Sequence, residues 1–288
     1  MNYELRTKNG FTLVELLVAV GILAIVLSFS SVIFRVSIDA HRTAIATAEI
    51  MQKLRAITDQ LNVDFKGARR DHGGYISFGY DGSKIDGEIV RVKSDNIVFF
   101  ANGDFQSTGQ HGGRTVVGNV ACIFYTLLDP NSHNGVPEPK EKILVRRQTV
   151  LTADDSLPDM DSDPRGEYFK TSLSQWRVAP PFVDPNEWAR RPRMNLNNLT
   201  QGDLVMYMAR GVDNFKIQYV PWTQGGTVQW LPVGDEDSGT INPRAFKFTF
   251  TLYDSKGVLK EGRTFTRISF MPSIESSFCL TSLTMRSS

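Results

Sequence analysis

The residues with the clearest chemistry lie near the amino terminus. Gly10 separates a short leader, which carries Arg6 and Lys8, from the 24 residues 11–34, whose only charge is Glu15. A run of this length can cross a bilayer, since a spanning helix needs about 20 apolar residues. In a secretory signal peptide the small residue of the cleavage site follows the apolar core. Here it precedes the core, so cleavage after Gly10 removes the leader and leaves the apolar helix attached.

Glu15 carries the second chemical signal. A carboxylate inside an apolar span is energetically costly unless it is paired, and it marks a functional site by default. Phe11 and Glu15 are four residues apart, so after cleavage the new α-amine at Phe11 and the Glu15 carboxylate lie on one helical face. We therefore predict a functional role for Glu15. The alternative is a Glu15 close enough to the membrane surface to stay hydrated.

A long helix must position these residues. Beyond the apolar run the periodic pattern continues, and its apolar positions are spaced by four, three, four and four residues. These positions are Ile50, Leu54, Ile57, Leu61 and Phe65. We predict one helix from about Phe11 to near Arg70, in which residues 11–34 cross the membrane and residues 35–70 form an amphipathic spine. Gly67 weakens this helix, and Gly73-Gly74 ends it.

Residues 71–288 have the composition of a β-rich head. Runs rich in Val, Ile, Phe and Tyr, separated by turn residues, predict strands at 88–93, 96–101, 120–128 and 143–150. Residues 246–253 alternate between apolar and mostly polar, which predicts a strand with one buried face, and after a turn at 254–257 its partner spans 263–271. Residues 152–203 look irregular. The predicted fold class is α+β, with a long helix packed on an antiparallel sheet.

The charge balance argues against a nucleic-acid partner. The chain has 288 residues, 41% of them hydrophobic, and a formal net charge of +1. Residues 71–288 carry 23 Lys and Arg against 25 Asp and Glu, a net charge of −2. A nucleic-acid-binding domain usually shows a basic footprint. The two cysteines, Cys122 and Cys279, either form one disulfide in an oxidising compartment or remain two buried thiols, and both alternatives stay open.

Known catalytic patterns are missing from the sequence. The four histidines stand far apart, without metal-ligand spacing. No Gly-x-Ser-x-Gly turn or glycine-rich phosphate loop occurs. Asp159, Asp161 and Asp163 alternate like calcium ligands, but Pro164 stands where the loop needs glycine, so a solvated acidic loop is the better interpretation. We predict a protein that is not an enzyme and has no cofactor or metal.

The segment Gly10-Phe11-Thr12-Leu13-Val14-Glu15 resembles the processing site of type IV prepilins and type II secretion pseudopilins. The resemblance implies that a prepilin peptidase cuts after Gly10, that Phe11 becomes N-methylated, and that Glu15 can meet the amine of a neighbouring subunit. It also implies a single-pass protein of the bacterial inner membrane, with its head in the periplasm and the type IV pilin fold.

Three later segments narrow the resemblance. Residues 211–219, 230–232 and 242–246 together look like the J-type minor pseudopilin and the related W-type minor pilins. The resemblance implies a structural subunit at the tip of a type II secretion pseudopilus, which initiates or caps assembly with I-, K- and major-type subunits. The alternatives are a minor type IV pilin that serves pilus assembly, adhesion, motility or DNA uptake and, from another class, a membrane-anchored enzyme or ligand-binding protein.

Overall fold

The computed structural model describes residues 12–69, 77–81, 94–128, 140–157, 167–170, 207–221, 229–232 and 243–271. The chain divides into two compact units, Met1–Ala48 and Glu49–Ser288. Helix α1 (Leu13–Lys66) supplies the described part of the first unit and continues into the second. The expected α+β fold class is confirmed.

Helix α1 is uninterrupted because its 54 residues contain no proline and one glycine, Gly21. The predicted end near Arg70 is wrong, since the helix stops at Lys66. Immediately afterwards the backbone joins a strand: Asn102 N donates to Gly67 O at 2.7 Å, and Arg69 N donates to Phe100 O at 2.8 Å. The pairing to the sheet therefore replaces further helical turns. Gly73-Gly74, the expected stop, lies outside the described residues.

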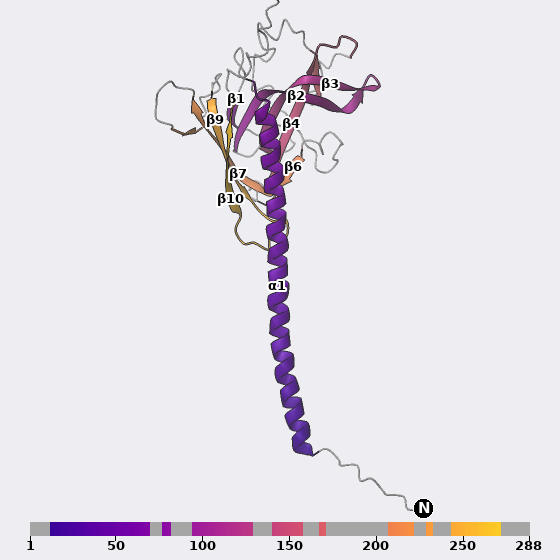
Figure 1. The fold of residues 1–288 in the computed structure, drawn as a ribbon, viewed down its shortest axis with the longest axis vertical. Coiled ribbons are helices and arrows are strands. Elements are labelled where there is room, and N and C mark those ends of the chain that lie inside the picture. The colour runs from indigo at the N-terminus through magenta and orange to yellow at the C-terminus, as the bar shows by residue number, and fades with distance from the viewer. Residues whose placement is uncertain are drawn as a thin grey trace, which may run out of the picture. The chain divides into compact units, whose positions relative to one another are not determined.

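The second unit contains two sheets, where the sequence predicts one. The first has the order β1 (Ser77–Asp81), β2 (Ser94–His111), β3 (Arg114–Leu128), β4 (Ile143–Thr152) and β5 (Tyr168–Lys170), and β6 (Tyr207–Arg210) also pairs with β4. The second has the order β10 (Arg263–Phe270), β9 (Pro243–Leu252), β7 (Val212–Pro221) and β8 (Leu231–Pro232). Among the described residues all strand pairings are antiparallel except that of β4 with β5. Figure 1 labels these strands except β5 and β8.

Most of the predicted strands are confirmed. Residues 96–101, 120–128 and 143–150 fall within β2, β3 and β4, and the predicted pair at 246–253 and 263–271 forms β9 and β10. Residues 88–93 lie outside the described residues. The irregular segment 152–203 is corrected at Tyr168–Lys170, which forms β5. This strand was missed because three residues are too short for a visible alternation.

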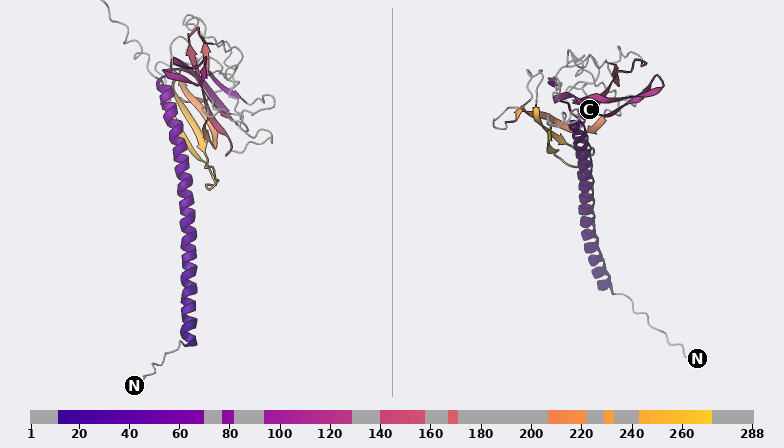
Figure 2. Two further views of the ribbon diagram at one scale, coloured as in Figure 1. Left: turned by 90° about the vertical axis from the view of Figure 1, so that its right-hand side faces the viewer. Right: turned by 45° about the horizontal axis from the view of Figure 1, so that its top comes forward.

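The core of the second unit lies between the carboxyl-terminal part of α1 and both sheets (Figure 2). The four stripe residues Ile50, Ile57, Leu61 and Phe65 are buried, and Leu54 packs beside them half-buried. The Phe65 ring stacks on Phe99 of β2 at 4.5 Å and lies 5.4 Å from Phe246 of β9. One helical residue thus contacts both sheets. The core-facing side chains of β9 are Phe246, Phe248, Phe250 and Leu252, all fully buried.

Candidate functional site

Glu15 lies in the first turn of α1 and bonds to the residue that caps it. Its Oε2 accepts hydrogen bonds from the backbone N and the Oγ1 of Thr12, both at 2.9 Å, and Thr12 Oγ1 accepts from Glu15 N at 3.3 Å. Leu16 N donates to Thr12 O, which makes Thr12 the N-cap. This reciprocal arrangement is a capping box, and it satisfies backbone donors that the helix itself cannot.

Sequence reasoning missed Thr12, although the spacing Thr-x-x-Glu before an apolar run is the signal of a capping box. The carboxylate assigned to assembly therefore has a second, local partner. Gly10 and Phe11 lie outside the described residues, so cleavage, methylation and the pairing of Glu15 with an amine stay predictions.

The amino-terminal part of α1 is apolar and exposed. Leu13, Leu16 and Phe34 are 80%, 62% and 70% exposed, and the other large apolar side chains between them are similarly uncovered. By length and composition, α1 is able to cross a membrane. A surface of this kind needs lipid or other apolar helices around it, because water is an unfavourable solvent for it.

Asp64 forms a buried polar hub in the second unit. Its carboxylate is 2% exposed and receives Arg146 Nε at 2.6 Å, Arg146 Nη2 at 2.7 Å, Gln60 Nε2 at 3.0 Å and the hydroxyl of Tyr125. Burial, reinforced by the Asp64 charge, raises the pKa of Tyr125 well above its ordinary value. Burial acts to lower the pKa of Arg146, but the bonds to Asp64 outweigh it and raise that pKa. The hub joins α1 to β3 and β4.

A second polar contact joins α1 to the segment after β9 through the side chains of Glu49 and Lys53. Glu49 Oε1 accepts from Ser255 N at 2.9 Å, Glu49 Oε2 accepts from Ser255 Oγ at 3.0 Å, and Lys53 Nζ donates to Tyr253 O at 2.9 Å. Glu49 and Lys53 also pair with each other at 2.7 Å. Partial burial acts to raise the pKa of Glu49, but these donors hold it below its ordinary value. We call this contact the Glu49 clamp.

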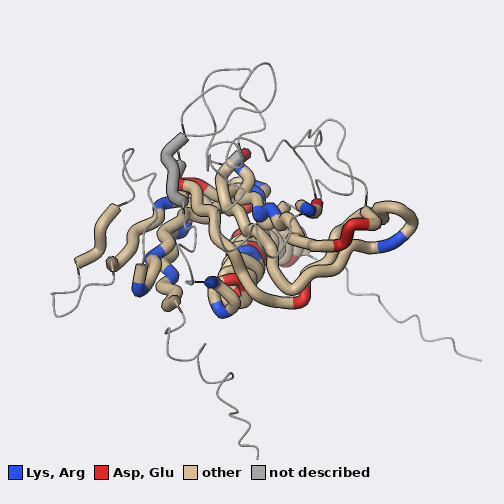
Figure 3. The backbone as a smooth tube through the Cα atoms, turned by 90° about the horizontal axis from the view of Figure 1, so that it is seen from above, with Lys and Arg blue, Asp and Glu red and all other residues tan. Residues whose placement is uncertain are grey.

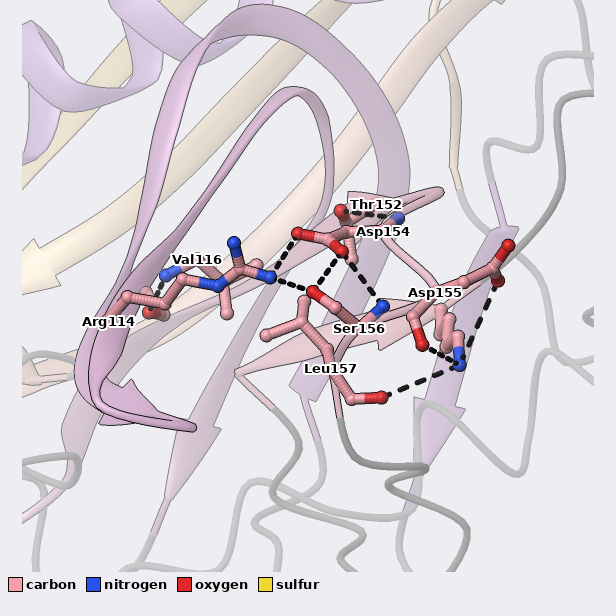
Figure 4. A network of polar contacts seen from close by, with 9 residues as sticks. Arg114, Val116, Thr152, Asp154, Asp155, Ser156 and Leu157 are labelled. Atoms are coloured by element: carbon pink, nitrogen blue, oxygen red, sulfur yellow. Dashed lines mark hydrogen bonds and ion pairs between the residues drawn. The ribbon is translucent and has the colours of Figure 1, made fainter.

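The far end of the β2–β3 hairpin rests on pieces of the 152–203 segment. Glu167 Oε2 accepts from Gly109 N at 2.6 Å and lies 3.2 Å from His111 Nε2. Figure 4 shows Arg114 reaching Asp154 and Ser156. Hydrogen bonds from the Ser156 hydroxyl and backbone hold the pKa of Asp154 below its ordinary value. These contacts support the hairpin, and the segment left unassigned by sequence supplies them.

The remaining predicted site residues do not converge. Cys122 is a buried thiol on the other face of the first sheet, and burial raises its pKa to about 12. Cys279, like Asp159, Asp161 and Asp163, lies outside the described residues, so the disulfide stays a prediction. Within the part that the structure describes, no group of three His, Cys, Asp or Glu side chains is placed to hold a metal ion. Lys and Arg residues occur together with Asp and Glu residues on the described strands and helix (Figure 3).

Residues 5–31 match the prokaryotic N-terminal methylation motif, the signal of type IV pilin- and pseudopilin-class proteins. Comparison with curated proteins gave no match. Comparison with solved structures gave none either. The motif covers Gly10, Phe11, Thr12 and Glu15 and ends inside the apolar part of α1. It indicates a structural subunit class and is compatible with a single-pass membrane anchor.

Proposed function

We propose that this chain is a minor pseudopilin, a structural subunit near the tip of a type II secretion pseudopilus that initiates or caps assembly for protein export. The observation that carries the proposal is the methylation motif at residues 5–31 joined to one unbroken helix. The amino-terminal part of that helix is apolar and uncovered, whereas its stripe from Ile50 to Phe65 is buried in the head. Such a helix is built to exchange lipid for neighbouring helices.

The partners follow from this exchange. When a subunit leaves the bilayer, the apolar surface of residues 11–34 needs a new cover, at about 25 cal/mol per Å² of apolar area. Helices of other pilin-class subunits supply that cover, and the I-, K- and major-type pseudopilins are the partners we propose. The head resides in the periplasm and the anchor in the inner membrane. The helix is processed and methylated at Phe11 by a prepilin peptidase.

Glu15 gives the sharpest test, because two roles of its carboxylate can be separated. Glu15→Val removes both the capping box and any pairing with an amine. Thr12→Ala removes the cap and keeps the carboxylate. Ser28→Val is the matched polar-to-apolar control in the same helix, because Ser28 Oγ donates to the backbone oxygen of Ala24 one turn earlier. All three variants should insert in the membrane, and recovery in the assembled filament or tip complex is measured.

We expect Glu15→Val to be lost from the assembly, with Thr12→Ala and Ser28→Val retained. Recovery of Glu15→Val at the parent level overturns the pairing role. Equal loss of Thr12→Ala and Glu15→Val assigns the defect to the cap.

A fragment that begins near Arg35 should be soluble and folded. Light scattering of its mixtures with I- and K-type heads tests the tip complex, and monomers in every mixture overturn it.

The motif at residues 5–31 is shared with minor type IV pilins, which serve adhesion, motility or DNA uptake. The genetic neighbourhood separates the two machines. A secretion ATPase and an outer-membrane secretin without a retraction motor favour secretion, whereas a retraction motor beside the gene favours a pilus.

A further inference from the structure

Strand β10 lies at one edge of the four-stranded sheet. Within the described residues β10 pairs with β9 alone, so the backbone groups along its other edge have no strand beside them. An open edge is a template for another strand. Many edges are shielded by charges or prolines, so the side chains of β10 decide what the edge accepts.

One face of β10 carries two arginines that have no acidic partner among the described residues. Arg263, Phe265, Arg267 and Ser269 lie on the side of the core, as the packing of Phe265 on Phe250 shows. Arg267 Nη2 donates to Asn62 Oδ1. Among the described residues, neither the buried Nε of Arg267 nor the buried Oγ of Ser269 has a hydrogen-bond partner. Neither arginine has an ion pair in the described part of the chain. This face lacks negative charge.

The opposite face of β10 is apolar toward its end. Ile268 and Phe270 point outward together, 40% and 71% exposed. Their neighbours across the strand pair are Lys247 and Ala245, and Lys247 Nζ lies over the Trp230 ring at 5.1 Å. Scattered exposed apolar residues are normal, but two at alternate positions of an open edge form a contact surface.

We propose that β10 is a docking edge for an extended segment of another protein, in which acidic side chains alternate with apolar ones. Added as a strand, such a segment places carboxylates beside Arg263 and Arg267 and apolar side chains beside Ile268 and Phe270, because side chains alternate between faces and opposed Cβ atoms lie about 5 Å apart. Main-chain bonds give affinity, and the side-chain alternation gives specificity.

The same arginines exclude other occupants. A second copy that paired β10 with β10 in antiparallel register about Phe265 would place Arg263 opposite Arg267, and like charges directly opposite are destabilising. An uncharged strand would bury the Arg267 guanidinium further without supplying a counter-charge, which is costly. Arg267 thus shields the edge against promiscuous pairing and accepts a strand that brings a carboxylate.

The full chain in non-ionic detergent tests the proposal with blocked eight-residue peptides. We expect a peptide of alternating Glu and Val to bind about tenfold more tightly than one of alternating Lys and Val. Two further peptides carry N-methyl groups on the odd-numbered or on the even-numbered backbone amides. Only one of these two sets points toward the sheet edge, so one of the two peptides should lose binding. Arg267→Glu and Arg263→Glu should reverse the charge preference, and Phe270→Ser should weaken binding of both peptides. Lys256→Glu, a matched charge reversal in the exposed turn after β9, should leave binding unchanged.

Circular dichroism verifies that each variant is folded, and Arg263, which is exposed, provides the reversal if Arg267→Glu unfolds. Equal affinity for the two peptides, no binding of either, or full binding of both N-methylated forms overturns the proposal. Concentration-dependent dimers that Arg263→Glu strengthens would assign the edge to a second copy instead. A DNA oligonucleotide that displaces the acidic peptide would likewise overturn the assignment to a protein strand.

Discussion

Arg146 of β4 donates two parallel hydrogen bonds to Asp64 of α1, from Nε to Oδ2 at 2.6 Å and from Nη2 to Oδ1 at 2.7 Å. This bidentate geometry holds the last turns of the helix at one position along the sheet, because the planar fork fits the carboxylate in a single orientation. The apolar stripe of α1 packs without such a requirement. We therefore expect hydrophobic packing to provide most of the free energy that holds α1 on the sheet, and the ion pair to fix the position of α1 along the sheet.

We predict that Asp64→Asn destabilises the head by about 3 kcal/mol, because it leaves the Arg146 guanidinium buried without its counter-charge. Replacing all three partners, Asp64→Leu with Arg146→Met and Tyr125→Phe, should recover most of that loss, because the buried Tyr125 hydroxyl also bonds Asp64 and would otherwise lose its acceptor. Asp59→Asn is the control, since Asp59 pairs with Arg55 on the same helix at 3.6 Å with both side chains exposed, and its cost should stay below about 1 kcal/mol. Urea unfolding followed by near-ultraviolet circular dichroism measures each change. Equal costs for Asp64→Asn and Asp59→Asn would contradict the register role.

Sequence periodicity predicted the buried stripe of α1 and the alternation of β9 because each pattern reports its own burial locally. It assigned Asp64, a charged residue between stripe positions, to the other faces of the helix, and this was wrong. Asp64 stands three residues after Leu61 and is buried. An acidic residue on an apolar stripe is the signal that was available. Its partners Tyr125 and Arg146 were beyond reach, since no local pattern tells which distant strands meet a helix.

The division of the head into two sheets was also unpredictable from local pattern. The strands of both sheets are rich in aliphatic and aromatic residues, so composition does not assign a strand to one sheet. The choice of partner depends on long-range pairings such as β4 with β6 and β7 with β9. The amino-terminal site was the most predictable part. Gly10, the apolar run and Glu15 lie in one continuous segment, so their pattern could be compared with the prepilin processing site, and residues 5–31 match the methylation motif. Cleavage, methylation and the role of Glu15 stay predictions.

Gly67 should resist substitution. A Cβ at this position would lie 2.2 Å from Asn102 O, and Gly67 O already accepts the Asn102 N–H. Gly67→Ala must push the helix end away from β2, and we expect it to lower the free energy of unfolding by about 2 kcal/mol. Gly109→Ala, on the same strand as Asn102, meets nothing closer than 3.4 Å and should have a small effect. Thermal unfolding of both variants makes the comparison, and a neutral Gly67→Ala would show that the junction relaxes.

The Glu49 clamp should weaken in acid. Because the pKa of Glu49 is lower in the folded protein than the ordinary value near 4.3, its contribution to stability is complete above about pH 5 and is lost as pH falls through the folded value. Glu49→Gln should therefore be less stable than the parent at pH 7, and the difference should shrink below about pH 4. Urea midpoints of both proteins from pH 7 to pH 3 measure it. A difference that stays constant with pH would mean that Glu49 contributes as a hydrogen-bond acceptor only.

Processing after Gly10 is the prediction that decides the class of the protein. Residues 1–10 carry Arg6 and Lys8, and cleavage frees the amine of Phe11 at the start of the apolar helix. Mass spectrometry of the membrane-extracted chain, expressed with a prepilin peptidase, should show loss of residues 1–10 and one added methyl group. Gly10→Val should keep the leader, because in the family that the motif resembles the peptidase site does not admit a branched side chain. Gly21→Val, in the same helix and with no atom within 4 Å of the added Cβ, should still be cut. A full leader on the parent chain in the presence of active peptidase would exclude the pilin-class assignment.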